Sequence, residues 1–242
     1  MIDEISKKLA PRGVLRVGLN MSNFLLVNSK DTNGLPGGVS PDIGKKLAEE
    51  LNLKFKFVQF ERPGLLADAV NDDKWDVGNI AHEKERSKTI DFSDPYVNID
   101  ANFLFRNKDN FNSNDEIDSS SIKIAVVDRS AYDLWLTENF KNAKLVKVGS
   151  IDKSHKLFRD GDADVLAGLK PKLLDELKIN NNFRIMSNPF TNIKQSIGIK
   201  KGNPKILKFL NDFISKIINE GYVESLLKKH NVQNKLSIPK TY

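Results

Sequence analysis

The sequence predicts an α/β protein built from two lobes. Strand-like and helix-like segments alternate along the chain, which is typical of the α/β class. A polar run at residues 107–121, rich in Asn, Asp and Ser, separates two such series and marks a boundary or a long surface loop. The chain has 242 residues, of which 39% are hydrophobic, so each series is long enough to bury a core.

The first series opens with a strand in which Leu15, Val17 and Leu19 alternate with other residues. A helix is expected to start at residues 40–42, with Ser40 as its cap, Pro41 in the first turn and Asp42 near the positive end of the helix dipole. The elements expected after it are a strand at 54–60, a helix at 63–70 and a strand at 75–80.

The second series repeats this order without a residue-level repeat. Its expected strands are 122–127, 145–148, 164–167 and about 184–186, and its expected helices are 130–140, 151–158 and 171–178. The last quarter reads as a strand at 193–199, a helix and a shorter helix at 222–229 that follows Gly221. The first of these helices carries an apolar stripe, which we interpret as core packing: Ile206, Leu210, Phe213, Ile214 and Ile217.

Composition excludes several functions. There is no cysteine, so a disulfide, a thiolate metal site and a thiol nucleophile are impossible. The net charge of +6 comes mostly from Lys interleaved with acids, which does not indicate nucleic-acid binding. His82, His155 and His230 lack a metal-ligand spacing and no nucleotide-binding pattern occurs, so we expect neither metal nor cofactor. No apolar stretch approaches the roughly 20 residues that span a bilayer, so no stable membrane insertion is expected.

The most informative segment is residues 75–97, which reads WDVGNIAHEKERSKTIDFSDPYV. It resembles the signature of the bacterial extracellular solute-binding proteins of family 3, the polar amino-acid receptors of ABC importers. Further segments resemble that family in the same order: GVLRVGLN, GVSPDIGKKLAEEL, IAVVDRSAYD, FRDGDADVLAG and KGNPKILKFLNDFISKIINEGYVESLLKKH. The resemblance covers nearly the whole chain.

This resemblance implies the periplasmic binding protein-like II fold, in which two α/β lobes are joined by a two-strand hinge and close over a ligand in the cleft between them. The expected lobes are residues 1–103 plus 197–242 and residues 104–196. The crossovers are expected near residues 101–105 and 194–197, and the protein is expected to be a monomer.

Arg86 matches the arginine that holds the ligand carboxylate in this family. A guanidinium offers paired donors in a plane, which fit a carboxylate better than the point charge of Lys. The chain has only 8 Arg among its 38 basic residues, which makes an Arg in this turn informative. The alternative is a surface Arg that pairs with Glu83 or Asp91.

In the second lobe, Ser130 and Asp133 have the spacing of a capping box. By resemblance, the turn of Ser130, Ala131 and Tyr132 presents backbone N–H groups and a hydroxyl to the same carboxylate, and a helix N-terminus favours anions in any case. The alternative is that these residues only stabilise the helix.

The remaining expected contacts also come from the resemblance. Asn20 and Asn23 match positions at the side-chain end of the pocket, although Asn also suits turns. Asn79 and Ala81 lie where the family holds the ligand's amino group with backbone carbonyls and hydroxyls; Ala81 has only its backbone to offer. Gly168 and Gln195 complete the expected ligand-binding set.

One departure from the family concerns the ligand's ammonium group. The acid that usually pairs with it falls on Leu169 in this chain. Either another acid such as Asp133 or Asp100 substitutes, or the ligand is a carboxylate without that amine. Aromatic side chains form an ammonium-binding wall in one interpretation and pack in the cores in the other: Trp75, Tyr96, Tyr132, Trp135 and Phe190.

We therefore expect a non-enzymatic receptor that binds a small carboxylate-bearing solute, an amino acid or a similar compound, and delivers it to an ABC transporter permease. The alternatives are a cyclohexadienyl dehydratase-like enzyme on the same fold, a receptor for a non-amino organic acid or a betaine, and the ligand trap of a sensor. Residues 1–4 lack the pattern of a signal peptide, and the resemblance implies a periplasmic protein whose signal peptide is absent from this chain.

Overall fold

The computed structural model describes residues 2–240 of the protein. The chain forms two compact units, of which unit 1 comprises residues 2–98 and 194–240 and unit 2 comprises residues 99–193. The chain leaves unit 1 within strand β7 (Val97–Arg106) and returns to it within strand β12 (Thr191–Lys200). Unit 1 is therefore discontinuous in sequence.

Unit 1 contains a mixed sheet in the strand order β4, β1, β5, β12. Strands β1 and β4 run parallel to each other, as do β1 and β5, and β12 is antiparallel to β5. A short strand β6 pairs with the end of β12, and β2 and β3 form a separate pair. The bounds are β1 Val14–Asn20, β2 Ser29–Lys30, β3 Pro36–Gly37, β4 Lys54–Phe60, β5 Val77–Ala81 and β6 Ile90–Phe92.

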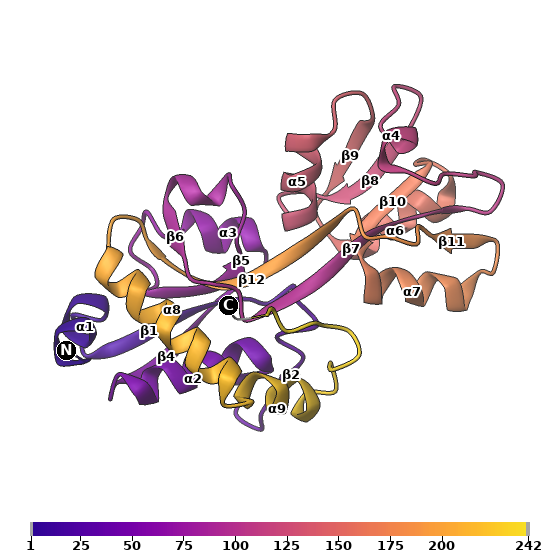
Figure 1. The fold of residues 1–242 in the computed structure, drawn as a ribbon. Coiled ribbons are helices and arrows are strands. Elements are labelled where there is room, and N and C mark those ends of the chain that lie inside the picture. Colours follow the sequence, from indigo (N-terminus) through magenta and orange to yellow (C-terminus); the bar gives the residue numbers. More distant parts are fainter. Residues whose placement is uncertain (1, 241–242) are drawn as a thin grey trace. The chain divides into compact units, whose positions relative to one another are not determined.

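Two helices cover opposite faces of this sheet (Figure 1). Helix α2 (Val39–Glu50) lies so close to β1 that a Cβ on its Gly44 would press on Val17. Helix α3 (Pro63–Asp68) lies against the other face, where a Cβ on Gly18 would meet Leu66. Neighbouring residues of a strand point to opposite faces, so Val17 and Gly18 assign the two helices to the two sides.

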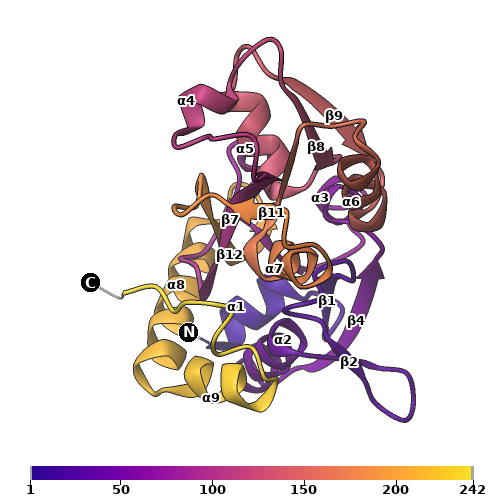
Figure 2. The ribbon, with the colours of Figure 1, turned by 90° about the vertical axis from the view of Figure 1, so that its right-hand side faces the viewer.

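The C-terminal segment packs on unit 1 through α8 (Pro204–Asn219) and α9 (Tyr222–Lys229). The predicted apolar stripe of α8 is buried, as expected of a core-facing helix. Figure 2 shows α1 (Ile2–Leu9) beside α8. Lys205 of α8 pairs with Glu4 of α1, so the N-terminal helix lies against the C-terminal segment in this unit.

The strands of unit 2 are hydrogen-bonded in the order β7, β10, β8, β9, and β11 pairs with β7. Strands β10, β8 and β9 are parallel, and β7 is antiparallel to β10. The new strands are β8 Lys123–Val127, β9 Lys144–Val148, β10 Val165–Leu169 and β11 Phe183–Ile185. The helices are α4 Asn114–Ile117, α5 Ala131–Asn139, α6 Ile151–Asp160 and α7 Lys170–Ile179.

A core cluster of buried side chains holds unit 2 together, with Leu104, Phe158, Leu166 and Leu173 among its members. They come from β7, α6, β10 and α7, so both helices pack on the same sheet. The polar run at 107–121 lies within this unit and contains the short helix α4, which is capped by the side chain of Ser113. The run is thus a loop of unit 2 that contains one short helix.

Two sequence expectations about local structure were wrong or incomplete. Helix α2 begins two residues earlier than expected, and its cap is Gly38 rather than Ser40. Gly38 has φ +140°, a conformation that favours glycine, and a Cβ there would collide with the Leu26 carbonyl. Ser40 instead shares a hydrogen bond with the buried hydroxyl of Tyr96, at 2.8 Å. Helix α1 and strands β2, β3 and β6 were not predicted.

Candidate binding residues of the two units

In unit 1, the carboxyl ends of the parallel strands β1 and β5 lie at the same edge of the sheet. Asn20 is the last residue of β1 and Ala81 the last residue of β5. Ligands of open α/β sheets bind beyond this kind of edge. The predicted ligand residues of unit 1 are thereby brought to one region of the unit.

Arg86 is buried, with only 5% of its surface exposed. It begins the short 3₁₀ helix η1 (Arg86–Lys88) that follows β5. Its Nη1 donates a hydrogen bond to the carbonyl of Ala81, at 2.8 Å, which anchors the guanidinium at the end of β5. The interpretation of Arg86 as an exposed surface residue is therefore wrong, and the Ala81 carbonyl positions the guanidinium.

Asn79, Ala81 and Gln195 share one face of the sheet. Gln195 lies opposite Ala81, and Ile197 lies opposite Asn79, in the antiparallel pairing of β12 with β5. All three residues are buried, Asn79 to 3% exposure. Within residues 2–240, neither Oδ1 nor Nδ2 of Asn79 has a hydrogen-bond partner, although both atoms are shielded from solvent. An amide left in this state is unusual and costly.

Asn20 and Asn23 stabilise the turn after β1. Oδ1 of Asn20 accepts hydrogen bonds from the backbone N–H and the hydroxyl of Ser22, at 3.2 and 2.7 Å. Oδ1 of Asn23 accepts one from the N–H of Leu25, at 3.3 Å. These are the local bonds by which Asn favours turns. Both side chains have a structural duty here, and a role in binding stays a prediction.

His82 lies just past β5 and stacks on Phe92, with ring centroids 4.6 Å apart and planes 13° from parallel. The backbone N–H of His82 donates a hydrogen bond to the carbonyl of Lys194 in β12. Burial, together with the charge of Lys194, lowers the pKa of His82. His82 is therefore a neutral, packed ring near neutral pH rather than a second cation beside Arg86.

In unit 2, the predicted capping box is present at the start of α5. Ser130 Oγ accepts a hydrogen bond from the N–H of Asp133, at 3.1 Å, and the Asp133 carboxylate accepts one from the N–H of Arg129, at 2.7 Å. Ser130 also bonds to the buried hydroxyl of Tyr132, whose pKa is raised by burial. Ala131 and Tyr132 are the first residues of the helix, so the helix itself offers no hydrogen-bond acceptor for their backbone N–H groups.

Gly168 serves the packing of unit 2. It lies in β10, and a Cβ there would come within 3.1 Å of Leu173 in α7. A larger residue would push α7 away from the sheet. This steric role explains the glycine without a ligand, so its contact with a ligand stays a prediction.

The two acids considered as substitutes at Leu169 differ in their surroundings. Asp133 is fully buried and is occupied by Arg129, Thr137 and the ammonium of Lys147, which lies 2.9 Å away. Asp100 is 37% exposed; it accepts a hydrogen bond from Asn192 and lies 3.7 Å from Lys170. Asp133 is thus committed to the helix start, and Asp100 belongs to a loose surface cluster.

The aromatic residues do not form one group. In unit 1, Trp75 is in the core and donates its indole N–H to the Leu66 carbonyl, while Tyr96 bonds to Ser40. In unit 2, Trp135 and Phe190 lie 5.4 Å apart, and Phe190 stacks on Phe103. Core packing is the correct interpretation for Trp75.

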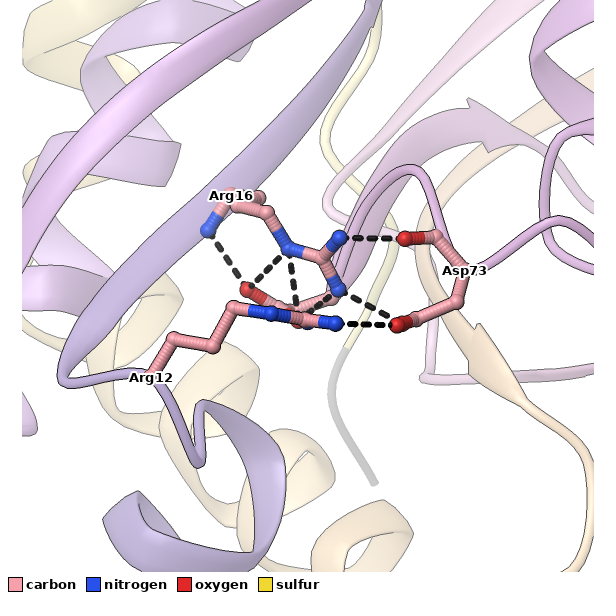
Figure 3. A network of polar contacts seen from close by, with 4 residues as sticks. Arg12, Arg16 and Asp73 are labelled. Carbon is pink, nitrogen blue, oxygen red and sulfur yellow. Dashed lines mark hydrogen bonds and ion pairs between the residues drawn. The ribbon is translucent and has the colours of Figure 1, made fainter.

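Sequence reasoning missed a polar network at the opposite end of the unit 1 strands (Figure 3). Arg16 near the start of β1 is buried, and its guanidinium lies 2.6 Å from Asp76, just before β5, and 2.7 Å from Asp73. Asp76 also accepts the backbone N–H of Arg16, at 2.7 Å, and Arg12 pairs with Asp73. An arginine inside an otherwise apolar strand is the sequence feature by which the network could have been found.

The described residues contain no group of three or more His, Asp or Glu arranged to hold a metal ion. In the same part of the chain, no helix is long and apolar enough to cross a membrane.

Comparison with known families identifies the class of protein. The family model of the bacterial extracellular solute-binding proteins, family 3, matches residues 15–233. The match spans most of the chain, so the protein belongs to this family.

Individual relatives are distant but cover almost the full length. The L-cystine-binding protein TcyJ of Escherichia coli (strain K12) is 23% identical over 227 residues, which cover 92% of this chain and 84% of the relative. A putative ABC-transporter binding component of Wolinella succinogenes, solved with lysine, has a TM-score of 0.74 at 23% identity and covers 90% and 95% of the two chains.

A reconstructed ancestral amino acid-binding protein, AncCDT-1, described as a precursor of cyclohexadienyl dehydratase, is also similar. Its TM-score is 0.73 at 26% identity, and the alignment covers 94% of this chain and 97% of that one. The two-unit α/β architecture is thus shared with solved amino acid-binding proteins.

Proposed function

We propose that the protein is the solute receptor of an ABC importer and that its solute is an amino acid or a close analogue held by its carboxylate. Membership of the family supports a role in solute binding. The relatives that bind cystine and lysine support an amino acid as the class of ligand. A periplasmic or cell-surface location and delivery to a membrane permease follow from the same proposal.

The observation that carries the proposal is the buried guanidinium of Arg86 at the carboxyl end of β5. The Ala81 carbonyl fixes the position of the guanidinium, and a fixed planar donor group suits a carboxylate. Considered by itself, unit 2 has another anion-binding group, the N–H groups at the start of α5, next to Ser130.

We further propose that the protein binds its solute without chemical change. A dehydratase of cyclohexadienyl carboxylates needs a proton donor, such as a carboxylic acid kept neutral in an apolar pocket. Among the described residues, each buried carboxylate contacts a basic side chain: Asp42, Asp76, Asp133 and Glu176. Each of them thus has a cationic neighbour, so none lies in the purely apolar surroundings that the acid catalyst needs. The similarity to AncCDT-1 makes prephenate the substrate to test.

The test is a calorimetric titration of the protein with the standard amino acids and cystine, followed by the same titration of Arg86→Ala and Arg86→Lys. Truncating one partner of a buried charge pair costs about 2–5 kcal/mol, so Arg86→Ala is expected to weaken binding at least about 30-fold. Arg86→Lys keeps the charge but loses the planar fork, so it is expected to recover only part of the affinity.

Arg62→Gln is the matched control, because Arg62 is exposed at the start of α3. It should bind as tightly as the wild type. Retention of full affinity by Arg86→Ala would refute the assignment of the carboxylate site. Conversion of prephenate, followed by absorbance, would refute the assignment as a receptor that leaves its solute unchanged.

A further inference from the structure

Strand β4 forms one edge of the sheet of unit 1. It stands at the end of the strand order and, among the described strands, pairs with β1 alone, in parallel and along all seven of its residues. Figure 2 shows β4 along the outer side of the unit. Every second backbone N–H and C=O group of an edge strand points away from the sheet and is free to pair with another chain. β4 therefore offers an open hydrogen-bonding edge.

This edge lacks most of the features by which proteins protect an exposed strand, namely a short strand, a Pro, a bulge or a covering segment. β4 contains no Pro and keeps its register with β1 over its whole length, so no bulge interrupts it. Four of its seven residues are exposed, so no described segment covers it. The strand at the other end of the order, β9 of unit 2, has only five residues.

The two faces of β4 differ in chemistry. Phe57 pairs with Val17 in the register, and Val17 faces helix α2, so Phe55 and Phe57 lie on the α2 side of the sheet. Their rings lie 5.2 Å apart, and Phe55 is 37% exposed. Lys54 and Lys56, the edge lysines, alternate with the two Phe and lie on the other side. A strand that pairs with this edge therefore meets aromatic rings on one side and ammonium groups on the other.

The edge lysines have no acid to neutralise them in the part of the chain that the structure describes. Both are exposed, and neither makes an ion pair or a side-chain hydrogen bond within residues 2–240. Arg16 of β1 is the register partner of Lys56. Its two acidic partners, Asp73 and Asp76, are already bound to arginines (Figure 3). The positive charge along the edge is therefore available to an acidic partner.

The same charges disfavour a second copy of this chain as the occupant of the edge. Two β4 strands that pair antiparallel over their full length place the edge lysines of both copies on one face of the joined sheet, without an acid among them. A parallel pairing in register places each lysine beside its own copy, and like charges opposite each other destabilise a pair of strands. An acidic strand meets neither obstacle.

We propose that the β4 edge is a docking site for an extended segment of a partner protein, which adds to the sheet of unit 1 as a further strand. The segment alternates acidic and apolar residues, so that its carboxylates meet Lys54 and Lys56 and its apolar side chains cover Phe55. Backbone hydrogen bonds along β4 contribute the affinity, and the alternation of side chains contributes the specificity. The inference does not depend on which solute the protein binds.

The test uses two synthetic heptapeptides that differ only in charge, one of alternating Glu and Val and one of alternating Lys and Val, both capped at their ends. Calorimetric titration at low salt should detect binding of the Glu peptide, and added salt should weaken it because exposed charges are screened. The Lys peptide should bind at least about 10-fold more weakly, since cross-strand pairs of opposite charge stabilise a sheet and pairs of like charge destabilise it.

Hydrogen exchange measured by NMR shows whether the peptide adds as a strand or is only attracted by the lysines. At saturation, the Glu peptide should slow the exchange of alternate N–H groups of β4 at least about 10-fold and leave those of β9 unchanged. A Glu peptide that is N-methylated at every second residue, along the edge that meets β4, cannot donate the backbone hydrogen bonds. It should therefore give no such protection.

The double variant Lys54→Glu and Lys56→Glu reverses the charge of the edge. It should bind the Glu peptide at least about 10-fold more weakly than the wild type and should bind the Lys peptide more tightly by a similar factor. Lys144→Glu is the matched control, because Lys144 is an exposed residue of β9, the strand at the other end of the order. Thermal melting shows whether each variant is folded, and Lys54→Gln with Lys56→Gln replaces a double variant that is not.

Three outcomes of the peptide experiments would overturn the inference. They are failure of the wild type to bind the Glu peptide, equal binding of the Glu and Lys peptides, and binding that leaves the exchange of the β4 N–H groups unchanged. Analytical ultracentrifugation without peptide tests the remaining occupant. A dimer of the wild type in which the same β4 N–H groups are protected would assign the edge to a second copy of this chain and would also overturn the inference.

Discussion

The two ends of strands β1 and β5 differ in how their polar groups are satisfied. At the amino end, Arg16 is surrounded by Asp73, Asp76 and a backbone carbonyl, and Asp76 also receives the N–H of Arg16. At the carboxyl end, Asn79 has no partner within the described chain. A saturated network stabilises the fold, whereas an unsatisfied one costs stability and is available to a ligand. Within one sheet, the Arg16 network is therefore satisfied by the fold, whereas the Asn79 amide is not satisfied within the described chain.

Unit 2 has a similar hydrogen bond at the amino ends of its strands β8 and β10. Asp164 precedes β10 and accepts a hydrogen bond from the N–H of Lys123, the first residue of β8, at 2.8 Å. Asp76 has the same relation to β5 and β1. In both units an acid just before one parallel strand binds the backbone near the start of the neighbouring strand. This explains why the segments WDVG and ADVLAG both carry an Asp directly before the strand.

The largest loss in the free energy of unfolding is expected for Asp76→Ala. It leaves the buried guanidinium of Arg16 with only Asp73 as its acidic partner, and breaking a buried pair costs about 3–5 kcal/mol. Urea unfolding measures this loss, and the affinity of the folded protein for its amino acid should be unchanged. Asp72→Ala is the control, because Asp72 is exposed and pairs only with exposed Lys74; its cost should stay below about 0.5 kcal/mol. A similar cost for both variants would contradict the comparison.

The second prediction concerns the carboxyl end. Asn79→Leu should raise the free energy of unfolding by about 1–2 kcal/mol, because it removes an unsatisfied buried amide. The same variant should lose affinity for the amino acid. Chemical denaturation without ligand and calorimetry with ligand measure the two effects. A variant that is both less stable and fully active would show that the amide has a structural duty after all.

The third prediction tests the hydrogen bond between Asp164 and Lys123 in unit 2. Asp164→Ala removes the acceptor for the N–H of Lys123 and should cost about 1 kcal/mol, without a change in affinity. Asp162→Ala, two residues away at an exposed position, serves as the control and should be neutral. If the two substitutions cost the same, the acid before β10 does not hold the start of β8.

The smallest effect is a pH dependence at the amino end. Arg12 and Arg16 lower the pKa of Asp73 from 3.8 to about 2. A carboxyl whose folded pKa is depressed stabilises the protein above its unfolded pKa, and this contribution is lost as the pH falls from about 4 to 2. Asp73→Asn should therefore show a shallower loss of stability over this window than the wild type. Asp212→Asn, which removes an exposed ion pair on α8, is the control.

Acid-induced unfolding followed by circular dichroism at a series of urea concentrations measures the slope for each variant. Identical slopes for Asp73→Asn and the wild type would show that Arg12 and Arg16 do not lower the pKa of Asp73 in solution. The contribution of Asp73 to stability is expected to be small, because Asp73 is exposed and solvent screens its charge.

Local patterns in the sequence were sufficient to predict most elements of the fold. The strand at 54–60 was predicted with its observed bounds, and so was the helix at 222–229. Periodicity reports which face of an element is buried, and this is a local property. The cap of α2 was wrong because Gly38, rather than the better capping residue Ser40, meets the close approach of Leu26. That contact is between distant parts of the chain and leaves no local pattern.

The sequence by itself determined the class of the fold and the family, and it singled out Arg86 as a candidate ligand residue. These depend on residue types, spacing and order, which the chain displays directly. Only the tertiary structure decided that Arg86 is buried against Ala81 and that Asp133 pairs with Lys147. It also decided that the amide of Asn79 has no hydrogen-bond partner among the described residues. Whether a polar group is satisfied depends on which distant groups the fold brings to it, so it becomes known only when the chain is folded.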